Sequence, residues 1–385
     1  MNIAIALSLA LSLFLIVYHH AAYPLLLKIM RLLHDRKNKA KENRNISKAS
    51  HQTLGITIVI PAYNEEAFIE EKLNNLAFLD YPRNKLKIIV ACDGCTDKTE
   101  HLAKQCLEQY PDVDIEVFSF MENRGKCRLL NDVVQHVKSD IVVFSDVSSL
   151  VSIDALQVCN KVFSNSDIGG VNGNYRFLNP YSEGEASYWK YQRNIKLGEN
   201  QLGSILGAHG AFYAIRTHLF RELPESAIND DFIIPMRVIE QGYQVIYDER
   251  INAVELEPSS NDDNWKRRKR IGFGNIQQVF ILKNLLLPRY KGVAFSFFSG
   301  KALRVFMPFL MIYALVTSIY CALIWPILIP VALAQVAIYL IAAFVELFSQ
   351  LKVGRIPKLI HYLVAGHTAN LLGAINFISN KKIQW

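Results

Sequence analysis

The chain has 385 residues, of which 51% are apolar and 20% charged, with a formal net charge of +7. These values fit one soluble domain of ordinary size together with several membrane-spanning helices. Its basic residues gather beside apolar runs, a pattern that indicates contact with anionic lipid and excludes nucleic acid as the expected partner. The six cysteines are scattered, and the close pair Cys92 and Cys95 is interpreted as reduced thiols rather than as a zinc or redox site.

Residues 1–27 are predicted to form an N-terminal transmembrane helix. The run from Ile3 to Tyr23 contains no Lys, Arg, Asp or Glu and is long enough to cross a bilayer, and it lacks the charged leading segment and cleavage site of a signal peptide. Residues 28–53 follow as a strongly basic linker. Because positively charged loops stay inside, we expect this linker to be cytoplasmic.

Residues 54–290 are predicted to form one α/β domain with a mainly parallel central sheet. Apolar runs typical of buried strands alternate with helical patterns, as expected of successive βα units. The expected strands are Ile56–Pro61, Leu86–Ala91, Ile115–Phe120 and Ile141–Phe144, and the expected helices are Glu65–Phe78, Lys98–Gln109, Lys126–Val137 and Ile153–Phe163. Asn64 is expected to cap the first helix, and Thr96 or Asp97 the second.

Residues 291–385 are predicted to form a C-terminal membrane region, with an interfacial segment and two to three transmembrane helices. The candidate runs are Val305–Pro326, Pro330–Phe348 and the weaker Leu359–Ile378. We therefore expect an integral membrane protein, in the inner (plasma) membrane of a bacterium, with residues 54–290 in the cytoplasm.

Acidic residues recur where predicted strands end and where one further helix begins. Asp93 and Asp146 each close an apolar run, and Asp230 and Asp231 open a helical pattern. Open α/β sheets bind ligands at the carboxyl ends of their strands. The three acidic positions therefore predict one active centre.

The sequence resembles the family 2 glycosyltransferases at six blocks that occur in the family's order: ITIVIPAYNEE, ACDGCTDKT, RGKCRLLNDV, VVFSDVSS, GAHGAFYAIR and NDDFIIPMRVIEQGY. These blocks lie between about residues 54 and 275, and the flanking apolar runs resemble the membrane-bound cellulose-synthase-like and hyaluronan-synthase-like branch. The resemblance implies a GT-A fold and an inverting transfer from a nucleotide sugar, usually one carrying UDP.

The resemblance also implies a nucleotide-sugar site. It assigns to the donor Pro61, Ala62, Tyr63, Glu65, Asp93, Lys126, Asp146, Arg267 and Arg270, with Asp93 at the uracil edge and Lys126 at the phosphate or ribose. Three alternatives stay open: Glu65 as an ordinary first-turn acid, Lys126 as a solvated lysine, and the arginines as a lipid-headgroup patch.

A divalent cation, Mg²⁺ or Mn²⁺, is the expected cofactor, because a diphosphate leaving group carries charge that must be neutralised. An Asp-x-Asp motif aims two carboxylates at one metal. Here Asp146 matches the first acid and Ser148 stands at the second, so the expected ligands are one carboxylate and one hydroxyl.

Asp231 is predicted to be the catalytic base, since it matches the last acid of the family's threonine-glutamate-aspartate motif and Asp230 matches the acid before it. The helix dipole is expected to keep Asp231 ionised. His209, Gly210 and Trp265 are expected at the acceptor. Ile271 replaces the tryptophan of the family's Gln-x-x-Arg-Trp motif.

The expected function is inverting transfer from a UDP-sugar to a growing glycan in extracellular polysaccharide synthesis. The alternatives are single-sugar transfer to a lipid-linked acceptor, or a catalytically silent nucleotide-sugar-binding subunit of a glycan-export complex. The expected partners are the UDP-sugar, the glycan or lipid-linked acceptor, membrane lipid and, for export, a partner protein.

Overall fold

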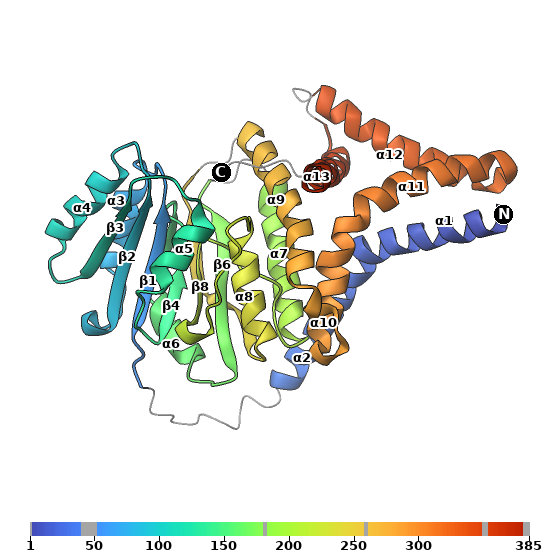
Figure 1. Ribbon diagram of the computed structural model, residues 1–385. Helices are drawn as coiled ribbons and strands as arrows, with labels where there is room; N and C mark the ends of the chain where they lie inside the picture. Colours follow the sequence, from blue (N-terminus) through green and yellow to red (C-terminus); the bar gives the residue numbers. More distant parts are fainter. Residues whose placement is uncertain (1, 40–51, 180–182, 258–260, 349–352, 380–385) are drawn as a thin grey trace. The chain divides into compact units, whose positions relative to one another are not determined.

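The computed structural model describes residues 2–39, 52–179, 183–257, 261–348 and 353–379, which fall into two compact units (Figure 1). The sheet unit holds the described residues within 30–259 and 282–294, and the helical unit those within 1–29, 260–281 and 295–384. Residues 260–281 thus group with the apolar helices, whereas the sequence predicted one domain over 54–290. Part of the expected basic linker, 40–51, lies outside the described residues.

The sheet unit is built on one mixed, mostly parallel sheet of eight strands in the order β3-β2-β1-β4-β7-β6-β8-β5. The strands are β1 (Ile56–Ala62), β2 (Leu86–Asp93), β3 (Asp114–Phe120), β4 (Ile141–Phe144), β5 (Ser149–Val151), β6 (Ile168–Phe177), β7 (Tyr213–Arg216) and β8 (Gln244–Glu255). β1 to β4 run parallel, β7 lies antiparallel between β4 and β6, β6 pairs parallel with β8, and β5 closes the edge antiparallel to β8.

Helices cover both faces of this sheet. They are α3 (Ile69–Ala77), α4 (Thr99–Gln109), α5 (Lys126–Val134), α6 (Ala155–Val162), α7 (Glu183–Asn200) and α8 (Asp230–Glu240). Because side chains alternate along a strand, Ile58 and Ile60 share one hydrophobic cluster with Leu73 of α3 and Leu156 of α6. On the sheet, α5 contacts β1 and β2, and α8 contacts β6, β7 and β8.

The four predicted strands and the helices after them are confirmed, with one local difference. Asn64 does not cap a helix that starts at Glu65. Its backbone has φ 53°, its side chain accepts a hydrogen bond from the Thr96 amide at 2.8 Å, and α3 begins only at Ile69. Lys98 is the N-cap of α4, and Asp97 just before it contacts the helix start, since its Oδ1 accepts the Thr99 amide at 3.0 Å.

Three helices among the described residues are apolar and long enough to cross a membrane, and most of their residues belong to the helical unit: Asn2–Leu33, Gly292–Ile324 and Pro326–Leu347. Its elements include α1 (Asn2–Val17), η1 (Tyr18–Ala22), α9 (Asn261–Ile281), η6 (Phe297–Ala302), α11 (Leu303–Ile324), α12 (Ile329–Leu347) and α13 (Arg355–Ile378), while α2 (Tyr23–Lys39), α10 (Gly292–Ser296) and short 3-10 turns complete the chain. The weaker run Leu359–Ile378 lies within α13, which is not among the three candidates. These helices agree with the predicted membrane protein.

Candidate active site

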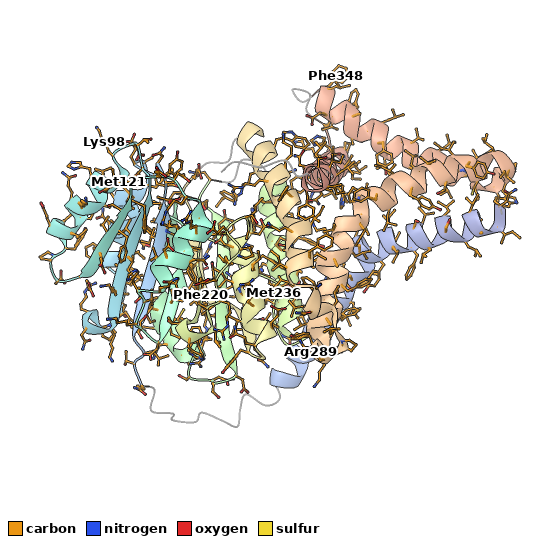
Figure 2. All side chains as sticks on the ribbon, viewed as in Figure 1. Lys98, Met121, Phe220, Met236, Arg289 and Phe348 are labelled. Atoms are coloured by element: carbon orange, nitrogen blue, oxygen red, sulfur yellow. The ribbon has the colours of Figure 1, made fainter. Side chains whose placement is uncertain are left out.

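Asp93 and Asp146 lie at the same edge of the sheet. Asp93 is the last residue of β2, and Asp146 follows β4 within a turn from Ser145 to Ser149. Figure 2 marks this edge with Lys98 and Met121, which follow the parallel strands β2 and β3. The predicted gathering of acidic residues at the carboxyl ends of the parallel strands is therefore present.

Lys126 joins two of the predicted acidic positions. Its Nζ lies 2.9 Å from Oδ1 of Asp146 and 3.3 Å from Oδ2 of Asp230, whose side chain is almost fully buried. The lysine opens α5 and Asp230 opens α8, so the bridge holds the first turns of two helices against the turn after β4. The lysine expected at a phosphate thus lies between two carboxylates.

The carboxyl of Asp231, the predicted base, has a pKa well above the usual value for an aspartate. Burial, followed by the neighbouring Asp230, raises the pKa of Asp231 to about 6, although Lys126 acts in the opposite direction. Desolvation is the largest cause of this raised pKa, and the predicted ionised state at neutral pH is compatible with it. A carboxylate with this pKa is ionised at pH 7 and still basic enough to accept a proton.

Gly210 brings a loop into direct contact with Asp146. The Asp146 amide donates to the Gly210 carbonyl at 3.0 Å, and a Cβ on Gly210 would lie 2.3 Å from Oδ2 of Asp146, so any larger residue would displace the Asp146 carboxylate. The same loop reaches the base, because the Ala208 amide donates to the Asp231 carbonyl at 2.8 Å. Loop 208–210 thus connects the predicted metal ligand and the predicted base through main-chain hydrogen bonds.

Asp93 orders the segment that precedes Lys126. Its buried carboxylate accepts the Arg124 amide at 3.1 Å and the Gly125 amide at 2.8 Å. Gly94 has φ +68°, and a Cβ there would lie 2.4 Å from the Asn123 amide nitrogen. Asp93 therefore positions the start of α5, and its contact with a nucleobase stays a prediction.

Four more residues expected at the nucleotide lie at the end of β1 or in the turn that follows it: Pro61, Ala62, Tyr63 and Glu65. Pro61 and Ala62 close this strand, and the Tyr63 side chain is exposed. Glu65 lies in the turn before α3, where its amide donates to Thr99 Oγ1 at 2.7 Å. Burial, then Glu257 and Asp146, raises the pKa of Glu65 to about 7, so its carboxyl belongs to the acidic surroundings of Asp146.

Arg267, Arg270 and Trp265 lie on α9 in the helical unit rather than in the sheet unit. The Lys269 ammonium lies 5.9 Å from the centre of the Trp265 ring. Ile271, which replaces the family's tryptophan, is exposed. Contact of the two arginines with a diphosphate, and of Trp265 with an acceptor, stays a prediction.

Lys72 is a residue of this site that the sequence analysis missed. It is fully buried in α3, and its Nζ donates to Ser145 Oγ at 2.6 Å and to the Ser149 carbonyl at 2.5 Å, the two ends of the Asp146 turn. Burial lowers the pKa of Lys72 to about 7. The sequence did contain a signal for this buried lysine. Lys72 lies three residues after Ile69, on the apolar face of its helix.

Lys196 and Glu199 of α7 were also missed. The Lys196 ammonium donates to the Gly207 carbonyl at 2.8 Å, and Glu199 Oε2 accepts the Leu206 amide at 3.0 Å. Both side chains are buried, and they fix the segment that leads into loop 208–210. No periodic pattern had predicted α7.

We expect Lys72→Met to weaken the Asp146 turn. The variant leaves the Ser149 carbonyl without this buried donor, so the free energy of unfolding should fall by about 1–3 kcal/mol, and the KM for the donor should rise because the turn is less ordered. Thermal unfolding and donor kinetics of the full chain in detergent measure both effects. Lys98→Met, at an exposed position, is the control; equal behaviour of the two variants would contradict the role of Lys72.

The residues around Asp146 fit a cation that is shared with a bound diphosphate. In the described part of the chain, no three His, Cys, Asp or Glu side chains come together as a metal cage. Mg²⁺ usually takes one or two carboxylates and completes its shell with water and phosphate oxygens. The partly exposed carboxylate of Asp146 meets that need, with the Ser148 hydroxyl in the same turn.

The fold is that of a GT-A glycosyltransferase. Among solved structures, mannosyltransferase PcManGT from Pyrobaculum calidifontis, in complex with GDP-Man and Mn²⁺, matches with a TM-score of 0.72 over 97% of this chain and 99% of that chain, at 20% identity. At this identity the likeness shows the fold alone. The predicted α/β class and GT-A architecture are confirmed.

The family follows from the sequence. The pattern of the family described as Glycosyltransferase like family 2 matches residues 52–274, more than half of the chain. The chain therefore belongs to the family 2 glycosyltransferases, enzymes that transfer sugar from nucleotide sugars, and the predicted resemblance is confirmed.

Two relatives are bacterial polysaccharide synthases. Poly-beta-1,6-N-acetyl-D-glucosamine synthase of Staphylococcus aureus (strain COL) is 27% identical over 224 residues, which are 56% of this chain and 53% of that protein. The synthase of the same name from Staphylococcus epidermidis is 25% identical over 245 residues, which are 61% of this chain and 58% of that protein. The chain thus spans little more than half the length of these relatives.

Proposed function

We propose that this chain is an inverting glycosyltransferase that moves a sugar from a UDP-sugar to a growing glycan in extracellular polysaccharide synthesis. The observation that carries this proposal is the cluster in which Lys126 bridges Asp146 and Asp230, with Asp231 adjacent in the first turn of α8. The relatives named as polysaccharide synthases support the class of product. The positive-inside pattern of the basic linker supports a cytoplasmic sheet unit at the plasma membrane.

In the proposed reaction, Asp231 removes the proton of an acceptor hydroxyl while that oxygen attacks the anomeric carbon. The bond from this carbon to the phosphate oxygen breaks on the opposite face, so the configuration inverts and UDP leaves. The Lys126 ammonium pairs with Asp146 and Asp230, and in the proposed reaction it releases one of these carboxylates and pairs with a phosphate of the donor instead. Asp146 and Ser148 would hold a divalent cation, which would supply positive charge to neutralise the leaving diphosphate.

Single-sugar transfer to a lipid-linked acceptor is the second candidate, favoured by Ile271 at the position of the family's tryptophan. A catalytically silent subunit is disfavoured by the retained Asp231 and by its raised pKa, which suits a base.

We expect purified full-length protein in detergent to release UDP from one UDP-sugar, with UDP-N-acetylglucosamine the first candidate because of the two relatives. Labelled UDP-N-acetylglucosamine, UDP-glucose, their 4-epimers and GDP-mannose are supplied in turn, and free nucleotide and labelled product are measured. Label in a water-soluble glycan supports the proposal, whereas label in an organic extract supports the lipid-linked acceptor. Turnover of GDP-mannose alone would contradict a UDP donor.

A further inference from the structure

A small cavity of about 230 Å³ lies between the end of β6 and the first half of α7. Aromatic side chains of both elements line it, namely Tyr175, Phe177 and Trp189, together with the polar Asn174, Arg176, Lys190 and Arg193. Ligand sites in proteins are usually apolar and aromatic with a few placed polar groups, and drug-sized ligands need about 300 Å³ or more. This cavity therefore suits a single ring rather than a chain of them.

The aromatic wall of the cavity continues to the catalytic residues. The Trp189 ring lies 4.5 Å from that of Tyr175 and 5.0 Å from that of His209, centre to centre. His209 precedes Gly210, whose backbone contacts Asp146. The Trp189 ring of the cavity wall thus contacts a side chain of the loop that connects Asp146 with the predicted base.

Hydrogen-bonding groups surround the aromatic wall. Arg176 is exposed and donates to Asn252 Oδ1 at 2.6 Å, and Lys190 is exposed at the rim. Arg193 is paired with Glu249, so its charge is already balanced. A pyranose presents C–H groups on its flat face and hydroxyls around its edge, and this matches an aromatic wall with a polar rim better than a phosphate does.

We propose that this cavity is a subsite for one pyranose ring of the acceptor glycan, with Trp189 as the stacking platform. The inference rests on the proposed transfer to a glycan. Trp189 lies in the same compact unit as Asp146 and Asp231, whereas Trp265 on α9 belongs to the other unit.

The test uses full-length protein in detergent, UDP-N-acetylglucosamine and a β-1,6-linked N-acetylglucosamine trisaccharide as acceptor probe. Trp189→Ala is expected to raise the KM for the trisaccharide about tenfold, the loss expected for one aromatic contact, while the donor KM and the acceptor-independent release of UDP stay within twofold. Trp189→Phe should recover most of the affinity, since it restores a stacking ring. Phe78→Ala, at an exposed aromatic side chain that contacts Tyr110, is the matched control and should change neither constant.

A second measurement does not depend on whether the Trp189→Ala variant folds. The protein is labelled with 5-fluorotryptophan, the Trp189 fluorine resonance is assigned from its absence in Trp189→Phe, and the trisaccharide is added without donor. A shift of the Trp189 resonance supports the subsite. A shift of the Trp265 resonance alone, or an unchanged trisaccharide KM in Trp189→Ala, would overturn it.

Failure of the proposed function gives a different result. In that case the unsubstituted protein releases no UDP from any UDP-sugar, whatever the fluorine spectrum shows. An active protein whose Trp189 resonance does not respond retains the proposed function and loses the subsite.

Discussion

Asp231→Asn is expected to lower the turnover number by about 10²- to 10⁴-fold, the range contributed by a general base, while UDP affinity remains. The amide of asparagine keeps the size of the side chain but cannot accept the acceptor proton. The substitution also preserves the hydrogen bond from the Ala208 amide, because the main-chain carbonyl of residue 231 accepts it. Release of UDP under saturating donor measures the turnover, and binding of labelled UDP measures the affinity.

The pH profile provides a second readout of the same assignment. Because burial raises the pKa of Asp231 to about 6, the rate of the unsubstituted protein should be full above this value and fall as the pH drops through it. Asp154→Asn, at an exposed aspartate just before α6, is the control and should keep both the rate and the acid limb. Near-native turnover of Asp231→Asn would mean that another group is the base.

Removal of divalent cations is expected to lower the rate about 10²-fold or more, because a metal that neutralises a phosphoryl leaving group contributes several kcal/mol. Mn²⁺ or Mg²⁺ should restore the rate after chelation. Asp146→Asn should raise the cation concentration needed for half-maximal rate, since it removes the charge of the predicted carboxylate ligand. UDP release is measured across a cation titration for each protein.

Asp112→Asn, at a strongly exposed aspartate, is the control for this titration. Full activity of the unsubstituted chain in excess chelator would contradict the metal requirement. In that outcome cationic side chains carry the phosphate charge, and Lys126, already positioned between two carboxylates, is the first to substitute.

The sequence predicts well those parts of the site that depend on local pattern. Asp93 and Asp146 close β-branched runs, and parallel strand ends necessarily share one edge of a sheet. Asp230 and Asp231 open a helix whose periodicity is clear. Each of these positions follows from the strand or helix that precedes or contains it.

What the sequence did not predict depends on contacts between distant segments. The hydrogen bonds from Lys72 to Ser145 and Ser149, for example, join α3 to a turn that lies far along the chain. The raised pKa of Asp231 also depends on burial by the folded chain and on charges from other elements, which no local pattern shows. The grouping of α9 with α13 likewise arises from helix packing.

Loop 208–210 restricts how acceptor preference can be engineered or can diverge in evolution. A shift of this loop's backbone would move the main-chain partners of both Asp146 and Asp231, so selecting a new acceptor there would also alter the proposed chemical step. Exposed positions of α7, such as Lys190, make no such main-chain link. Libraries aimed at new glycan acceptors should therefore vary α7 and keep Gly210 fixed.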